Sequence, residues 1–202
     1  MVRACSLCFP ASDNAPVADE AKSPAEVLAM LVGQAPGITE VTTRRPFTGP
    51  AGKRLDGWLA EASLSRDEIH FAAVARCFPG KAKGGGDKVP SRAMIRNCRP
   101  HLDRDFEVYG PKVVILIGGL AIKEVLGIKT LSEVAGRIIE RDGVEYVPLP
   151  HPSGASTWLN SPENRARLGR SLSELKELMQ NLRLARENTG EERRNAATRA
   201  SS

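Results

Sequence analysis

The sequence holds 202 residues, of which 41% are hydrophobic and 4% aromatic. This length and apolar content fit one globular domain and exclude a wholly disordered chain. Lys and Arg outnumber Asp and Glu by 29 to 24, a net charge of +5, which suits a phosphate-bearing partner such as nucleic acid.

The N-terminal segment, residues 1–26, is rich in Ala, Ser, Pro and Asp, and we predict an extended arm there. Its first residues lack the apolar core of a secretory signal, and the chain lacks the roughly 18–20 consecutive apolar residues of a membrane span. We therefore expect a cytoplasmic protein with no membrane partner. An apolar run at 27–32, ended by Gly33, predicts a buried strand of the parallel type.

Further strands and helices follow from apolar runs and from helical spacing of apolar residues. We predict strands at 69–74, 113–117 and 144–149, and helices at 51–61, 91–106, 120–126 and 164–184. Residues 80–89 form a basic, glycine-rich loop, and the polar residues 187–202 predict a disordered tail.

The alternation of strands and helices predicts a single α/β domain over residues 1–186. We expect a three-layer α/β/α sandwich with a central, mostly parallel four-stranded sheet. In such sheets, ligands bind at the carboxyl ends of the strands, so the loops after the predicted strands are the candidate site.

Four cysteines suggest a metal centre. Cys5 and Cys8 form a C-x2-C pair, and Cys77 and Cys98 complete a set of four thiols. In a reducing compartment such thiols are more often metal ligands than disulfides, and four thiolates suit a cubane iron–sulfur cluster or a structural zinc. Zinc ribbons usually carry two C-x2-C pairs and this chain has one, while unliganded buried thiols are a third possibility.

Several motifs occur in a specific order. The first strand ends in Gly33-Gln34-Ala35-Pro36-Gly37, Glu40 follows, and residues 46–52 read PFTGPAG. The last strand ends in His151-Pro152-Ser153. Together with the cysteines, this order resembles the family-4 uracil-DNA glycosylases, the iron–sulfur class, over roughly Cys5 to Leu182.

The resemblance implies a role for each matching position. Cys5, Cys8, Cys77 and Cys98 would hold a 4Fe–4S cluster. Gly33, Ala35, Pro36, Gly37, Phe47 and Ser153 would form the base pocket, with Phe47 stacked on the flipped uracil. The catalytic candidates are His151, Glu40 and Gln34. His151 would hydrogen-bond the O2 side of the pyrimidine, and its neutral imidazole N–H would stabilise the developing anion.

The chain departs from family 4 at two positions and from other superfamily members at a third. Gln34 stands where family 4 usually has Glu, and Ala35 stands where other superfamily members have the Asp that positions water. Glu40, which matches a family-4 carboxylate, is our candidate for that role. Ala73 replaces the Asn that reads uracil and cannot make its paired hydrogen bonds. Selectivity must then come from backbone groups or another side chain, or the preferred base is different.

The implied function is DNA repair: a deaminated base, with uracil the first expectation, is flipped out of DNA and cut from its sugar. We expect a monomer acting at the nucleoid. Phosphates would be bound by five basic residues: Arg44, Arg45, Lys81, Lys83 and Lys88. An apolar side chain, from Trp158 or Leu159, would insert into the duplex. One alternative is a module that binds uracil or abasic sites with little turnover. Another is an electron carrier, although the chain has neither G-x-G-x-x-G nor a P-loop lysine motif.

Overall fold

The computed structural model describes residues 2–9, 14–154 and 156–200, with only the backbone described from residue 190 onward. Its strands form one five-stranded sheet with the order β2-β1-β3-β5-β4. The strands are β1 (Ala29–Gly33), β2 (Ile69–Ala73), β3 (Val113–Ile117), β4 (Ile139–Arg141) and β5 (Val144–Leu149). The α-helices are α1 (Ile38–Thr43), α2 (Pro50–Glu61), α3 (Arg92–Tyr109), α4 (Gly118–Leu126) and α5 (Pro162–Ala200).

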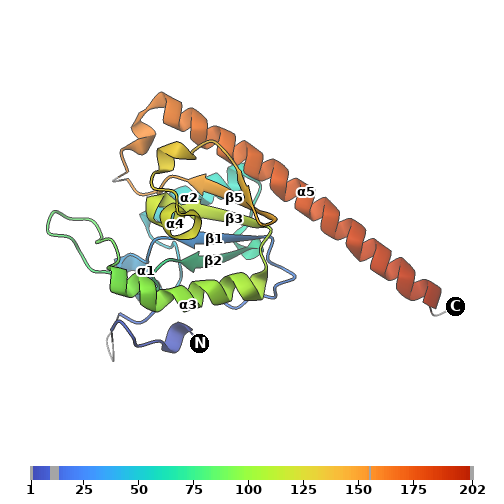
Figure 1. The fold of residues 1–202 in the computed structure, drawn as a ribbon, viewed down its shortest axis with the longest axis horizontal. Helices are drawn as coiled ribbons and strands as arrows, with labels where there is room; N and C mark the ends of the chain where they lie inside the picture. The colour runs from blue at the N-terminus through green and yellow to red at the C-terminus, as the bar shows by residue number, and fades with distance from the viewer. Residues whose placement is uncertain (1, 10–13, 155, 201–202) are drawn as a thin grey trace.

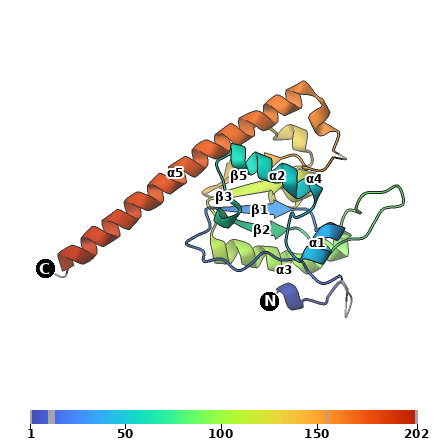
Figure 2. The same cartoon turned by 180° about the vertical axis from the view of Figure 1, so that it is seen from behind.

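Helices cover both faces of the sheet (Figure 1). Leu31 and Ile115 point to the face packed by α2 and α5, while Met30 and Leu116 point to the opposite face, packed by α3 and α4. This alternation follows from the two-residue period of a strand, and it explains why both central strands are apolar throughout. Figure 2 shows α2 and α5 together on their side of the sheet. The predicted three-layer α/β/α fold is confirmed.

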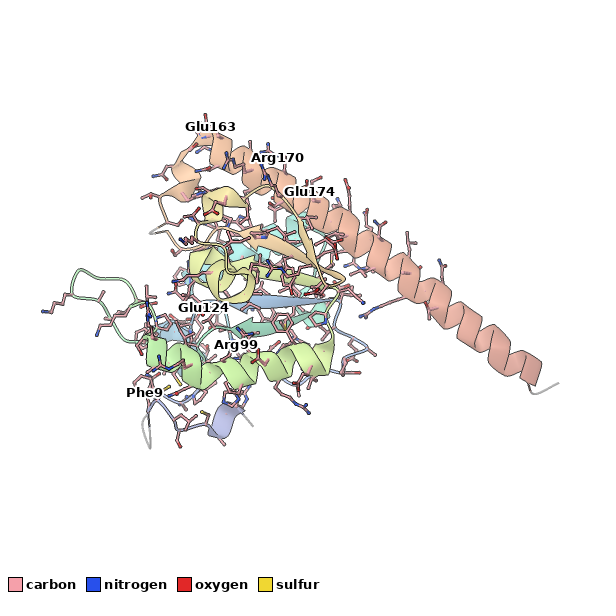
Figure 3. All side chains as sticks on the ribbon, in the orientation of Figure 1. Phe9, Arg99, Glu124, Glu163, Arg170 and Glu174 are labelled. Atoms are coloured by element: carbon pink, nitrogen blue, oxygen red, sulfur yellow. The ribbon has the colours of Figure 1, made fainter. Side chains whose placement is uncertain are left out.

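The ends of the helices follow local sequence signals. The hydroxyl of Ser91 accepts a hydrogen bond from the backbone N–H of Met94, so the predicted cap of α3 is confirmed. The helix ends at Gly110, which is left-handed with φ 47°. Arg99 of α3 donates to the carbonyl of Glu124 in α4 at 3.2 Å, which joins the two helices on one face of the sheet (Figure 3).

The N-terminal arm covers the outer edge of β2. Asp19 accepts a hydrogen bond from the backbone N–H of Phe71 at 2.9 Å, and the Lys22 ammonium donates to the carbonyl of Ile69 at 2.6 Å. These contacts satisfy backbone groups that an edge strand otherwise leaves unpaired.

The structure corrects three expectations. The sheet has a fifth strand, β4, which pairs antiparallel with β5 through a turn at Asp142 and Gly143, where φ is 54° and 72°. A short helix, α1, follows the glycine-rich turn, in a segment without a helical pattern of apolar residues. Where a disordered tail was expected from residue 187, the backbone of α5 continues as a helix to Ala200. Residues 201 and 202 lie outside the described part of the chain.

The physical reason for the long helix lies in its composition. Residues 187–200 are mostly Glu, Arg, Asn and Ala and contain no proline. Several of these residues have good helix propensity, so the segment can extend a helix that packing has already nucleated. Figures 1 and 2 both show this end of α5 projecting away from the sheet. Among the described residues, no helix combines the length and apolar character that a bilayer crossing requires.

Candidate active site

A cavity of about 770 Å³ opens at the carboxyl ends of the parallel strands. The turn after β1, the end of β2, the start of α4 and the loop after β5 all contribute to its wall. It therefore lies where ligands bind in open α/β sheets. Of the sequence-predicted residues, the structure brings these to the cavity: Gly33, Gln34, Ala35, Pro36, Gly37, Glu40, Phe47, Lys81, Lys88, His151 and Ser153.

Phe47 packs directly over Gly33. A Cβ added at Gly33 would lie 2.9 Å from Cζ of the Phe47 ring, so this close approach requires glycine. The ring also lies against Phe71, with 6.0 Å between centroids and planes tilted by 50°. The aromatic wall of the cavity is therefore anchored to the end of β1.

The backbone of Phe47 is held in an unusual conformation. Its φ is 53°, a left-handed value that costs free energy for any residue with a side chain. Arg66 donates to the carbonyl oxygens of Pro46 and Phe47 at 3.2 and 2.6 Å and so fixes the loop. Gly52 of α2 lies so close that an added Cβ would meet the Phe47 carbonyl oxygen at 1.8 Å.

Glu40 is buried, with 8% of its surface exposed. Its Oε2 accepts the backbone N–H of Gly37 at 3.0 Å, and its Oε1 accepts those of Thr48 and Gly49 at 2.9 and 2.8 Å. Both carboxylate oxygens are therefore used by the protein backbone. The residue joins the turn after β1 to the loop that carries Phe47.

His151 has a defined tautomer. Its Nδ1 accepts a hydrogen bond from the backbone N–H of Ser153 at 3.2 Å, which leaves the proton of the neutral ring on Nε2. Burial lowers the pKa of His151, partly opposed by the negative charge of Asp87, which favours the charged form. Gly118, with φ 84°, packs against the ring, where an added Cβ would lie 3.4 Å from the histidine Cβ. The site thus presents a neutral N–H donor.

Sequence reasoning missed two charged residues that line this cavity. Arg76, 3% exposed, forms an ion pair with Asp105 of α3 and donates to the carbonyl of Phe71 at 3.4 Å. Asp87 comes from the glycine-rich loop between β2 and α3. The available signal was that Asp87 is the single acid in that loop, which reads GKAKGGGDKV.

The remaining residues predicted for DNA binding do not line the cavity. Arg44 donates to the carbonyl of Ala15, and Arg45 pairs with Glu20, so both contact the N-terminal arm. Lys83 is exposed on the glycine-rich loop.

The two predicted wedge residues are half-buried on the loop after β5. Leu159 packs against the core between the sheet and α5. The Nε1 of Trp158 is buried and has no hydrogen-bond acceptor among the described residues.

Three of the four cysteines pack together near the first turns of α3, and Cys5 lies within electrostatic range of Cys77. Cys77 and Cys98 are buried together, and Cys8 and Phe9 of the arm pack against them. Figure 3 shows Phe9 beside this end of α3. Sulfur atoms accept two N–H groups, from Arg76 to Cys98 at 3.3 Å and from Asn97 to Cys8 at 3.5 Å.

The thiols are not arranged around a single metal ion. Across the described residues, no three His, Cys, Asp or Glu side chains are placed to hold one metal ion. A cubane binds its four thiolates through four different iron atoms, so its ligands lie further apart than those of one ion. Burial, and then the nearby Cys98, Cys8 and Cys5, raise the pKa of Cys77 to about 12, so four thiolates here need bound positive charge.

Comparisons with known proteins show the family of the chain. The sequence profile of the uracil DNA glycosylase superfamily matches residues 21–179. A type-4 uracil-DNA glycosylase of Sulfurisphaera tokodaii is 30% identical over 161 residues, which cover 74% of this chain and 69% of that protein. That of Archaeoglobus fulgidus is 29% identical over 61% of this chain and 64% of its own length. That of Saccharolobus solfataricus is 29% identical over 88% of this chain and 83% of its own length. The chain belongs to the uracil-DNA glycosylase superfamily, and within it the chain is similar to the type-4 enzymes.

Proposed function

We propose that this protein is a DNA-repair glycosylase that removes uracil from DNA and leaves an abasic site. The observation that carries the proposal is that one cavity combines an aromatic wall at Phe47 with a neutral N–H donor at His151. Base stacking on an aromatic ring is worth about 1–3 kcal/mol, which offsets part of the cost of taking the base out of the duplex.

The chemistry follows from where charge develops. When the glycosidic bond breaks, its electron pair stays on the base, and a pyrimidine spreads the resulting negative charge onto its O2. The Nε2–H of His151 would donate to this oxygen, as a preorganised donor does in an oxyanion hole. Because the ring is neutral, it stabilises the anion without transferring a proton. The turn at 33–37 would hold the base and sugar through its backbone.

Uracil recognition would rest on backbone groups. Ala73 lines the cavity at the end of β2, where it pairs in register with Gly33. Its methyl group can neither donate nor accept a hydrogen bond, so peptide groups of the turn would have to distinguish uracil from cytosine. Weaker selection is the expected result, because a site without its paired side-chain bonds rejects analogues less strongly.

The cofactor proposal is a 4Fe–4S cluster held by Cys5, Cys8, Cys77 and Cys98. It would fasten the N-terminal arm to the loop after β2 and to α3. Iron and acid-labile sulfide at about four of each per chain are expected, and both should fall in Cys98→Ser. Zinc in place of iron, or iron content unaffected by the substitution, would contradict this ligand set.

Binding to DNA would rely on exposed basic side chains around the cavity mouth. Lys81 and Lys88 lie on its wall, and Lys83 is exposed on the same loop. Phosphate contacts of this kind weaken with added salt, because binding releases counterions. Each lysine removed should therefore reduce the salt dependence of binding. Such an enzyme would work as a monomer on chromosomal DNA at the nucleoid.

The deciding experiment measures base release from an oligonucleotide that carries one uracil, with protein below substrate concentration. We expect many turnovers per enzyme, and a loss of about 10²–10³-fold in His151→Ala, the usual cost of removing one such donor. His101→Ala is the matched control, because His101 is a half-buried histidine outside the cavity. Tight binding without release from uracil, hypoxanthine or xanthine would instead establish a lesion-binding module.

A further inference from the structure

The cavity contains a carboxylate that none of the motifs accounts for. Asp87 belongs to the loop between β2 and α3, and it reaches the wall of the cavity near Gly37. A Cβ added at Gly37 would lie 3.0 Å from Oδ2 of Asp87. The acid therefore faces the turn on which the base and sugar are proposed to bind.

The loop that carries Asp87 is ordered by its own hydrogen bonds. Lys81 and Asp87 form a bridge of the antiparallel type, and the Lys81 ammonium lies 2.7 Å from Oδ1 of Asp87. The backbone N–H of Lys88 donates to the carbonyl of Gly80 at 2.8 Å. Glycines at 80, 85 and 86 have positive φ values, which permit this tight hairpin. Asp87 is thus presented from a defined position rather than from an open coil.

The two acids on the cavity wall differ in what their oxygen atoms contact. Both oxygens of Glu40 accept backbone N–H groups. Oδ1 of Asp87 pairs with Lys81, whereas Oδ2 has no hydrogen-bond donor within the described part of the chain. Ala35 has no polar side chain, and the amide of Gln34 is not a base. Asp87 is therefore the acid on this wall with an oxygen available to a water molecule.

The negative charge of Asp87 also affects His151, on the other side of the cavity. Its carboxylate acts on His151 by favouring the charged form of the ring, so the two side chains are within electrostatic range. A negative charge opposite the neutral donor suits a reaction in which the sugar becomes cationic while the base becomes anionic. The histidine would face the anion and the aspartate would face the cation.

We propose that Asp87 is a catalytic residue of this glycosylase and orients the attacking water at the sugar. This assignment rests on the proposed function. The bond between C1′ and the base nitrogen breaks, and its electron pair leaves with the base. The water oxygen forms the new bond to C1′, and one water proton passes to Asp87, which returns it to the departing base or to solvent. Loop 80–88 would thus supply the carboxylate that Ala35 lacks.

The test is single-turnover base release with the full, cluster-loaded protein in excess over a uracil oligonucleotide. Binding is measured in parallel by fluorescence anisotropy at the same salt concentration. Asp87→Asn keeps the size of the side chain and an oxygen for Lys81 but removes the base. We expect its rate at saturation to fall on the order of 100-fold or more, with DNA affinity within about threefold of the parent.

Two variants make the result specific. Asp103→Asn is the matched control, because Asp103 is an exposed aspartate on α3 that pairs with Arg99 outside the cavity, and its rate should not change. Asp87→Gly should lose the same activity and regain part of it when formate is added, because a small carboxylate can occupy the vacated space. A purely structural role would not respond to formate.

Other results would overturn the proposal. An Asp87→Asn rate within twofold of the parent would remove Asp87 from the reaction. Equal losses of rate and affinity would make the loop a DNA contact instead. If the parent protein itself released no base, the proposed function would be wrong, and the role of Asp87 with it. If the parent released base and Asp87→Asn released it equally fast, only the role of Asp87 would be wrong.

Discussion

The carboxylate of Glu40 accepts the backbone N–H of Gly49 at 2.8 Å, across nine positions of sequence. Gly49 is the N-cap of α2, and the same carboxylate also accepts the N–H of Gly37, the N-cap of α1. One buried acid therefore caps two helices and fixes the distance between the turn after β1 and the loop of Phe47. The geometry of the cavity wall around Phe47 depends on this residue.

Glu40→Gln should destabilise the fold more than it alters chemistry. An amide has one acceptor oxygen, so its NH2 group would face a backbone N–H and at least one of the three bonds would be lost. Hydrogen bonds to charged groups are worth about 1.5–3 kcal/mol, which sets the expected loss in free energy of unfolding. Urea denaturation measures it. A variant as stable as the parent would show that the carboxylate does not hold these loops.

Two glycines of α2 offer a matched pair. A Cβ at Gly52 would meet the Phe47 carbonyl oxygen at 1.8 Å, whereas a Cβ at Gly57 meets no heavy atom of the described residues within 4 Å. Gly57→Ala should therefore stabilise the protein by up to about 1 kcal/mol through helix propensity. Gly52→Ala should destabilise it by about 1–3 kcal/mol or more, because the loop must move. Thermal unfolding of the two variants should shift in opposite directions.

The neutral state of His151 can be tested by its titration. Burial lowers its pKa from the ordinary value of 6.5, so the unfolded chain takes up a proton at a pH where the folded chain does not. Its contribution to stability is therefore present above about pH 6.5 and is lost as the pH falls from there through the folded pKa. Two-dimensional NMR of the ring should show the proton on Nε2 and a midpoint below 6.5. A midpoint above 6.5 would contradict the assigned environment.

The buried ion pair at the cavity should contribute more to the free energy of unfolding than a similar pair on the surface. Arg76 is 3% exposed and pairs with Asp105, while Asp103 on the same helix forms an exposed pair with Arg99. Asp105→Ala leaves the buried guanidinium without its partner, and we expect a loss of about 3–5 kcal/mol. Asp103→Ala removes a surface pair and should cost about 0–1 kcal/mol. Equal losses in chemical denaturation would show that Arg76 is better solvated than its burial indicates.

The central strands could be predicted because each is a continuous run of apolar residues. The five apolar residues of β3 and the apolar stretch in β1 leave no alternative to a strand covered on both faces. β4 has three residues with only one half-buried, so it has no such pattern, although the Asp142-Gly143 pair was a usable hairpin signal. α1, which reads ITEVTT, is dominated by β-branched residues and is helical only in its tertiary context.

In the candidate site, too, some residues could be predicted from the sequence and others could not. Gly33, Phe47 and His151 were predicted from motifs that resemble those of the family-4 uracil-DNA glycosylases, and all three line the cavity. The burial of Glu40 depends on backbone N–H groups nine positions away, and periodicity does not encode such contacts. Asp87 was missed because a loop rich in lysine and glycine predicts a phosphate contact, whereas the hairpin turns its one acid toward the cavity. Long-range placement, rather than residue type, was the missing information.

The arm that carries Cys5 and Cys8 also covers the edge of β2, through Asp19 and Lys22. Detaching the arm would therefore expose unpaired backbone groups on a strand whose side chains are largely buried. Such an edge is a template for pairing with the same strand of another molecule. We therefore expect chains that lack this arm to associate into aggregates before any loss of helix or sheet becomes measurable.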